Sequence, residues 1–172
     1  SDSSSIYVIG NGLTNLSAQY GFEQWAKENC SKDFFKTFYD KNYGDVYFTT
    51  DETSLCFSER LDAFTSFMSY GGTPAMFNAG NSFYAIAGTG GGKYNPKLWK
   101  QFEGNYNSFF GSTKPYSITF ICNQDEPYDK IFNNIEFRAD TWDGNTLTSS
   151  TFDTLDVWNE YQHGTSSLVM NR

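Results

Sequence analysis

Basic residues are scarce in this sequence of 172 residues. Its 12 Lys and Arg stand against 20 Asp and Glu, which gives a formal net charge of −8. A protein that binds nucleic acid mainly through phosphate contacts needs a concentrated basic face, and so does a polybasic membrane-surface protein. No hydrophobic run approaches the roughly 18 apolar residues of a membrane-spanning helix. We therefore expect neither a nucleic-acid partner nor a membrane.

Cysteine and histidine are too few for the common metal and nucleophile motifs. Cys30, Cys56 and Cys122 are an odd number without close spacing, so neither a disulfide framework nor a zinc site is predicted. Small buried thiols in a reducing compartment are expected instead. The single histidine, His163, excludes a two-histidine metal motif, and no Gly-x-Ser-x-Gly elbow accompanies it. His163 is expected to be a turn residue that follows a strand.

Aliphatic side chains are also few, because 19 Ile, Leu and Val stand against 33 aromatic residues. Aromatic rings must therefore supply much of the buried area. Rings suit pleated, half-buried surfaces, and the Gly and Asn between them suit turns. The composition predicts a mainly β fold, with antiparallel hairpins in a sandwich or a propeller-like fragment and an N-terminal helix.

The helix is expected between residues 13 and 30, where Thr14 or Asn15 can act as the cap. Gly21 weakens this stretch, so it predicts either one helix of about three turns that begins near Phe22 or a broken pair. Residues 38–48 read as a strand, a turn at Gly44 and a second strand. Further strands or hairpins are predicted at residues 54–59, 63–70, 82–87, 117–122 (the clearest alternation), 131–139, around 143–145 and at 157–161.

The length suits one ordinary domain, although two small lobes also fit. We expect residues 1–172 to form a single β-rich module that is a fragment of a longer protein. The sequence starts Ser-Asp-Ser-Ser-Ser without a Met. Residues 1–12 are therefore expected to be either flexible or a start that derives from cloning, processing or excision from a longer chain.

Two loops resemble ligand-binding motifs, but their spacing fails. Residues 88–93 are glycine-rich and end in Lys93. A P-loop, however, has four residues between its first Gly and its Gly-Lys pair, and Ser or Thr follows the Lys. Here only three residues separate Gly88 from the Gly-Lys pair, and Tyr94 follows Lys93. A flexible hairpin loop is expected there. Residues 140–145 lack the alternating ligands and the terminal Glu of a calcium-binding EF-hand. We expect no catalytic residue, no cofactor site and no metal site.

Acidic residues occur in close pairs, which raises glycoside hydrolysis as a weaker alternative. Such an enzyme holds two carboxyl groups about 5–10 Å apart across a sugar. Most of the pairs fall in predicted turns, where solvated carboxylates are ordinary. The pairs are Asp51 with Glu52, Glu59 with Asp62, Asp125 with Glu126, Asp140 with Asp143, and Asp153 with Asp156.

Four aromatic residues near predicted loops offer a carbohydrate-binding face as the main alternative function. They are Trp99, Tyr106, Trp142 and Trp158. Exposed rings of this kind stack on sugar rings. With so few aliphatic residues, however, the core competes for each of them, and core packing is favoured for any single ring.

Several phrases of the sequence resemble one family of proteins. They are TFYDKNYGDVYF at residues 37–48, LCFSE at 55–59 followed by FTSFMSY at 64–70, and DKIFNNIEFRAD at 129–140. In this order they resemble large virion structural proteins of tailed bacteriophages that infect gut Bacteroidetes, the crAss-like group and its relatives. The resemblance covers roughly residues 38–161 and includes no catalytic signature.

The resemblance implies a stabilising or tail-associated role in the virion, assembled in the cytoplasm of the bacterial host. We therefore expect a non-enzymatic structural module that acts through protein–protein contacts. Its partners would be other virion proteins or the remaining domains of the same chain. Exposed strand edges or apolar patches are expected where these partners pack. A carbohydrate-binding or adhesion module with a glycan partner is the alternative.

Overall fold

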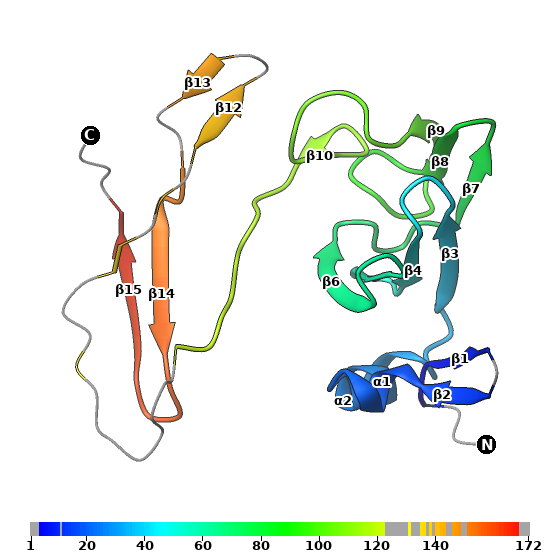
Figure 1. The fold of residues 1–172 in the computed structure, drawn as a ribbon. Coiled ribbons are helices and arrows are strands. Elements are labelled where there is room, and N and C mark those ends of the chain that lie inside the picture. The colour runs from blue at the N-terminus through cyan, green and yellow to red at the C-terminus, as the bar shows by residue number, and fades with distance from the viewer. Residues whose placement is uncertain are drawn as a thin grey trace. The chain divides into compact units, whose positions relative to one another are not determined.

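The computed structural model describes residues 4–10, 12–122, 131, 135, 136, 138, 140–143, 146–148 and 151–168. The chain divides into two compact units, Ser1–Thr119 and Phe120–Arg172, hereafter the first and second units (Figure 1). Strands make up 41% of the structure and helices 8%, so the predicted mainly β class with antiparallel hairpins is confirmed. The expectation of a single module stays a prediction.

The first unit begins with a short hairpin and two helices. Strand β1 (Tyr7–Ile9) pairs antiparallel with β2 (Leu13–Asn15), and helices α1 (Leu16–Gln19) and α2 (Glu23–Asn29) follow directly. Among the described residues, no helix is long and apolar enough to cross a membrane.

The two helices are separate because a glycine ends the first. The Asn15 side chain caps α1 by accepting the Ala18 N–H at 3.1 Å. Gly21 has a φ of 75°, and the Phe22 N–H then donates back to the Ser17 carbonyl at 2.8 Å. This left-handed ending with its 6→1 hydrogen bond is a Schellman motif, which stops a helix. Of the two predicted alternatives, the broken pair is therefore confirmed.

A four-stranded antiparallel sheet follows, in the order β3-β4-β5-β6. Its strands are β3 (Lys36–Asp40), β4 (Asp45–Thr49), β5 (Ser54–Ser58) and β6 (Ala63–Met68). Successive strands pair through short turns, as the alternation of the sequence predicted. The predicted meander over residues 38–70 is confirmed.

A three-stranded sheet, in the order β7-β8-β9, completes most of the first unit. Its strands are β7 (Ala75–Ala79), β8 (Ser82–Ala87) and β9 (Lys97–Lys100), and two-residue strands β10 (Ser108–Phe109) and β11 (Ser112–Thr113) form a hairpin beyond it. Only the central strand, β8, was predicted. It alternates buried and half-buried residues, whereas β7 and β9 lie at the two edges of the sheet and show a weaker pattern.

One face of the four-stranded sheet packs against the helices. Phe48, Leu55 and Phe57 of β4 and β5 form a buried cluster with Leu16 of α1 and Ala26 of α2. Aromatic rings fill the margin of this cluster, as the composition implied.

The opposite face packs against the three-stranded sheet. Tyr47 and Cys56 are the chain neighbours of Phe48 and Phe57, so the pleat turns them to the other side. There they form a second cluster with Met76, Phe83 and Ala85. Central strand β5 is consequently buried at every position. The helices, the four-stranded sheet and the three-stranded sheet thus form three layers, with the four-stranded sheet in the middle.

The Tyr47 hydroxyl is buried in this second cluster and has no hydrogen-bond partner among the described residues. The ring itself is well packed, 5.8 Å from the Phe83 ring between centroids. A buried polar group without a partner costs about 1–3 kcal/mol, so Tyr47→Phe is expected to raise the free energy of unfolding by about 1 kcal/mol. Urea denaturation of the two proteins measures this difference. A lower stability would show that the hydroxyl is hydrogen-bonded in solution.

The strand predicted at residues 117–122 is wrong. These residues are exposed and belong to no strand. Alternation of Ile118 and Phe120 can define the two faces of a strand, but a strand also needs a neighbour that accepts and donates its backbone hydrogen bonds. Among the described residues, no segment pairs with this one. The stretch also spans the boundary between the two units, which falls after Thr119.

The expectation of buried thiols holds in part. Cys56 is buried and Cys30 is half-buried, and burial raises the pKa of both thiols. The prediction is wrong for Cys122, which is exposed like residues 115–121 before it, because this stretch packs on no core of the described residues.

The second unit contains two antiparallel hairpins. Strand β12 (Thr141–Asp143) pairs with β13 (Thr146–Thr148), and β14 (Thr154–Trp158) pairs with β15 (His163–Ser167). The hairpins predicted around residues 143–145 and 157–161 are thus confirmed, although residues 144 and 145 themselves lie outside the described residues. Most of the strand predicted at 131–139 also lies outside them, and its described members belong to no strand.

Candidate binding surfaces

Trp99, the first of the four predicted binding aromatics, serves the interior of the first unit. It lies on β9, half-buried, and packs on the second core cluster. Its indole N–H donates to the Ala87 carbonyl at 2.8 Å, and its ring meets the Phe110 ring edge-on at 6.0 Å. With its polar atom engaged and its ring packed, Trp99 holds β9 and the β10–β11 hairpin on the core.

The other three predicted aromatics are divided between the units. Tyr106 is an exposed loop residue of the first unit. Trp158 ends β14 in the second unit, where its backbone pairs with His163, and it is exposed. Trp142 lies on β12 opposite Leu147, and its side chain is outside the described part of the structure. Trp99 and Tyr106 thus belong to one unit, and Trp142 and Trp158 to the other.

His163 begins β15 rather than lying in a turn. Its Nε2 is 3.8 Å from Asp156 Oδ1, and both side chains are exposed. Thr165 donates its hydroxyl to the same Asp156 oxygen at 2.6 Å. This cross-strand group stabilises the hairpin register. Screening by water keeps such an exposed contact weak.

The acidic pairs that raised glycoside hydrolysis are surface residues wherever they are described. The β4–β5 turn carries Asp51 and Glu52, and the β5–β6 turn carries Glu59 and Asp62, all exposed. Asp125 and Glu126 lie outside the described residues. Within the described ranges, no three His, Cys, Asp or Glu side chains gather closely enough to hold a metal ion.

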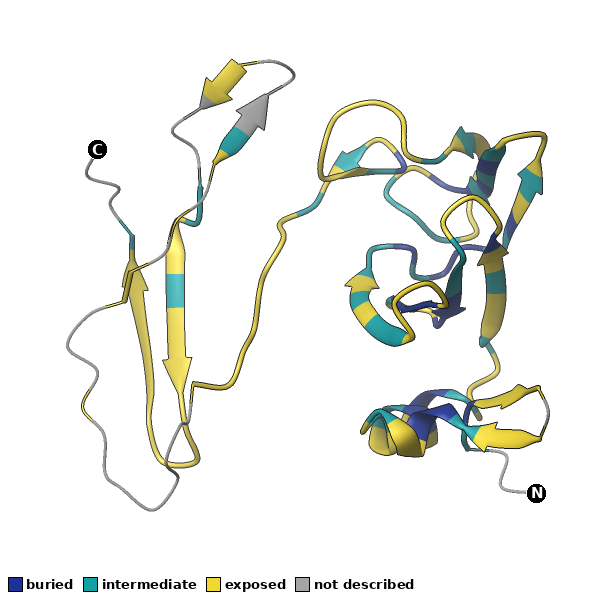
Figure 2. Ribbon diagram, viewed as in Figure 1, coloured by how far each residue is buried: buried dark blue, intermediate teal, exposed yellow. Residues whose placement is uncertain are grey.

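The β14–β15 hairpin presents apolar side chains to solvent. By strand alternation, Leu155 and Val157 share one face, opposite Ser166 and Gly164 of β15, and Trp158 lies on the other. Val157 is 45% exposed and Trp158 is 59% exposed. Every residue of both strands is exposed except the half-buried Leu155, and the hairpin is almost entirely yellow in Figure 2. Two strands alone are marginally stable in water, so this hairpin lacks the support that a third strand or a packed layer would give.

A second surface is a small pocket in the first unit, formed where three turns meet at one end of the two packed sheets. The β3–β4 turn supplies Asn42 and Tyr43, the β7–β8 turn supplies Asn81, and the chain leaving β9 supplies Gln101 and Phe102. We call this the turn pocket; Ser82, Phe83, Lys100 and Glu103 complete its lining. Its volume is about 220 Å³, and it opens to solvent.

Hydrogen bonds between the turns fix the shape of the turn pocket. Asn78 of β7 donates its side-chain N–H to the Tyr39 carbonyl at 2.7 Å and accepts the Lys41 N–H at 3.2 Å. These bonds tie the β3–β4 turn to the second sheet. The Gln101 N–H donates to the Phe83 carbonyl at 2.9 Å, which holds the segment after β9 against β8.

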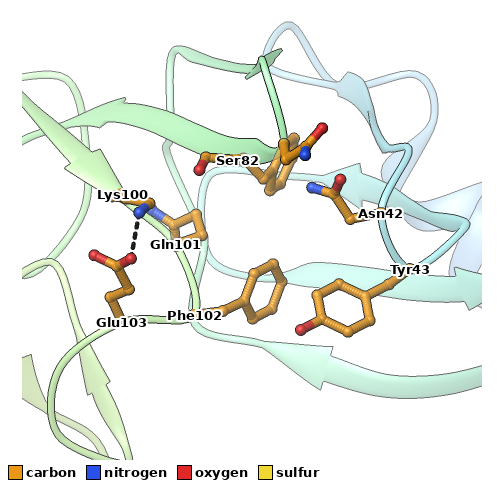
Figure 3. A pocket seen from close by; sticks show the side chains of 9 residues that line it. Asn42, Tyr43, Ser82, Lys100, Gln101, Phe102 and Glu103 are labelled. Atoms are coloured by element: carbon orange, nitrogen blue, oxygen red, sulfur yellow. Dashed lines mark hydrogen bonds and ion pairs between the residues drawn. The ribbon is translucent and has the colours of Figure 1, made fainter.

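Two half-exposed rings form one wall of the turn pocket. Tyr43 and Phe102 meet edge-on with their centroids 4.8 Å apart, and they are 45% and 52% exposed. Phe102 has a φ of 62°, in the left-handed region that a bulky side chain rarely adopts. Figure 3 shows the two rings facing each other, with the Lys100–Glu103 ion pair on the Phe102 side.

Comparisons with known proteins identify the family. The family model described as Crassvirus muzzle protein matches residues 1–89, which is more than half of the chain, and the model described as Crassvirus muzzle protein C-terminal domain matches residues 104–171. The chain belongs to the crassvirus muzzle protein family. The curated muzzle protein of Bacteroides phage crAss001 is 50% identical over 177 residues, which cover 98% of this chain and 12% of that relative.

Membership of the muzzle protein family confirms the predicted resemblance to virion structural proteins of crAss-like phages. The expected location in the virion is confirmed with it. The chain spans about an eighth of the length of its curated muzzle relative.

The residues of the turn pocket were not predicted from the sequence. A signal was nevertheless present, because a glycine stands next to Tyr43 and next to Asn81, and another lies two residues after Phe102. The three glycines are Gly44, Gly80 and Gly104, with φ values of 69°, 57° and 99°. That the three turns meet could not be read from their separate positions in the chain.

Proposed function

We propose that this chain is a non-enzymatic structural module of a crass-like phage muzzle and acts through protein–protein contacts of its second unit. The observation that carries the proposal is the β14–β15 hairpin, whose two strands expose apolar side chains and pack on no core within the described residues. Such a surface gains stability when a partner covers it.

The partner is another part of the muzzle assembly. The curated relative continues far beyond the region that matches this chain, so the same polypeptide and its neighbours in the virion offer ample surface. Either outer edge of the two-stranded hairpin can accept a further strand, and the face with Leu155 and Val157 can be covered by a second layer. A net charge of −8 on the chain favours a partner that is not strongly acidic.

Hydrogen exchange tests the proposal. In the separate 172-residue chain, the amides of β14 and β15 should exchange quickly, because the hairpin opens easily. In purified virions of the phage that encodes the chain, the same amides should exchange at least about 100-fold more slowly, which corresponds to roughly 2.7 kcal/mol of added protection. Central strand β5 is the internal control and should be protected in both states.

A matched pair of variants locates the contact. Val157→Asp places a charge on the apolar face and should lower incorporation of the muzzle protein into particles, whereas Ser167→Asp places the same charge on the opposite face and should have little effect. Equal exchange of β14 and β15 in chain and virion, or normal incorporation of Val157→Asp, would refute the proposal.

A further inference from the structure

The turn pocket has features of a small-molecule site that protein contacts through the second unit do not require. Binding sites in β-sandwiches commonly lie at the end of the two sheets, where loops from different strands gather on a rigid scaffold. This pocket lies at such a place, and hydrogen bonds through Asn78 and Gln101 fix its walls. The pocket belongs to the first unit, whereas the hairpin proposed to dock belongs to the second.

The chemistry of the lining indicates the class of ligand. Tyr43 and Phe102 offer apolar ring surface, while Asn42, Asn81 and Gln101 offer amide groups that both donate and accept hydrogen bonds. A pyranose ring has the matching halves, because it carries axial C–H groups on its faces and hydroxyl groups around its rim. Amides suit neighbouring hydroxyls, since each amide can donate to one and accept from another.

The size and charge of the pocket limit which sugars it can bind. At about 220 Å³ it is smaller than the roughly 300–1,000 Å³ of sites for drug-sized ligands, so it suits a single sugar ring. Lys100 and Glu103 are the two charged residues of the lining and pair with each other, so the lining has no net charge to attract an acidic sugar. We infer that the turn pocket binds one neutral pyranose residue, stacked on Tyr43 and Phe102 and hydrogen-bonded by Asn42, Asn81 and Gln101.

The left-handed backbone of Phe102 supports this assignment. A non-glycine residue at a φ of 62° carries a conformational cost, and such costs are concentrated at functional sites. Glycine would adopt the same backbone freely, yet this position holds a large aromatic ring that is half exposed. The ring therefore stays at the pocket wall although the left-handed backbone conformation is unfavourable for it, and a stacking surface requires that position.

Saturation-transfer NMR on the 172-residue chain tests the inference. The probes are the methyl glycosides of glucose, galactose, mannose and N-acetylglucosamine, each a single neutral ring. At least one should receive saturation from the protein, strongest at its C–H protons, and a short oligosaccharide that ends in the same ring should be contacted at that terminal ring. If none of the four probes receives saturation, the inference is refuted.

Variants assign the binding to this pocket. Phe102→Gly removes the ring and relieves the strained backbone, so the fold is retained while the Kd of the bound glycoside should rise at least about tenfold. Tyr43→Ala should weaken binding similarly, and Tyr43→Phe should retain it. Asn107→Gly, at another residue with positive φ, controls for the backbone, and Tyr106→Ala controls for loss of an exposed ring. Unchanged binding in Phe102→Gly, or equal loss in Tyr106→Ala, would overturn the inference.

Discussion

Gly71→Ala is expected to lower the free energy of unfolding by at least about 3 kcal/mol. A Cβ atom at this position would overlap the carbonyl carbon and oxygen of Glu52 and lie 2.7 Å from the Thr53 nitrogen. These are backbone atoms of the β4–β5 turn, which cannot move aside as a flexible side chain would. The turn is also fixed by the Gly72 N–H, which donates to the Thr50 carbonyl at 2.8 Å.

Gly10→Ala is the matched control for this prediction. Gly10 belongs to the same unit, and a Cβ atom there would meet none of the described atoms within 4 Å. The free energy of unfolding of the Gly10→Ala variant should differ from that of the wild-type chain by less than about 1 kcal/mol. Urea denaturation of the three proteins measures both effects. Equal stabilities for Gly71→Ala and Gly10→Ala would show that the β4–β5 turn is not packed against Gly71 in solution.

Alkaline pH is expected to unfold this protein steeply. Burial raises the pKa of Tyr47 and of Tyr70 far above the ordinary value for tyrosine. Smaller contributions come from Tyr70 and Cys56 at Tyr47, and from Asp40 and Cys56 at Tyr70. In the unfolded chain both tyrosines titrate near pH 10. Above that pH the unfolded state binds fewer protons than the native state, so the free energy of unfolding falls as pH rises. Each tyrosine contributes about 1.4 kcal/mol per pH unit, and the pair about 2.7.

The double variant Tyr47→Phe/Tyr70→Phe isolates this effect. Without the two hydroxyls, the fall in stability above pH 10 should be shallower by about 2.7 kcal/mol per pH unit. Urea denaturation at a series of alkaline pH values gives the slope, and tyrosinate absorbance reports when ionisation occurs. The same slope in the wild-type chain and the double variant would mean that both phenols ionise in the folded state.

The strands of the four-stranded sheet were predictable because each pairs with its neighbour in the chain. Short turns such as that at Gly44 bring β3 and β4 together without any distant segment, so local alternation is enough. The strand expected at residues 117–122 shows the limit of this reasoning. Its alternation is clear, but pairing depends on a neighbour that the pattern cannot supply.

The candidate sites were harder to predict. Trp99 was predicted to bind sugar because it is aromatic and lies near a predicted loop. In the structure its indole N–H donates to the Ala87 carbonyl and its ring packs on the core. Tyr43 and Phe102, which form one wall of the turn pocket, are 59 positions apart in sequence, and neither was predicted to bind a ligand. A site made of three turns exists only when the sheets that carry them are packed together.

By itself the sequence determined the β class, the meander, the location of the helical region and the likeness to phage virion proteins, since each depends on neighbouring residues or on their order along the chain. Only the tertiary structure decided which aromatic rings are buried, where the turns converge and which hairpin is left without a covering layer. Burial and convergence depend on contacts between segments far apart in the chain. The free energy of such a contact depends on both segments, so the local pattern of either one does not predict it.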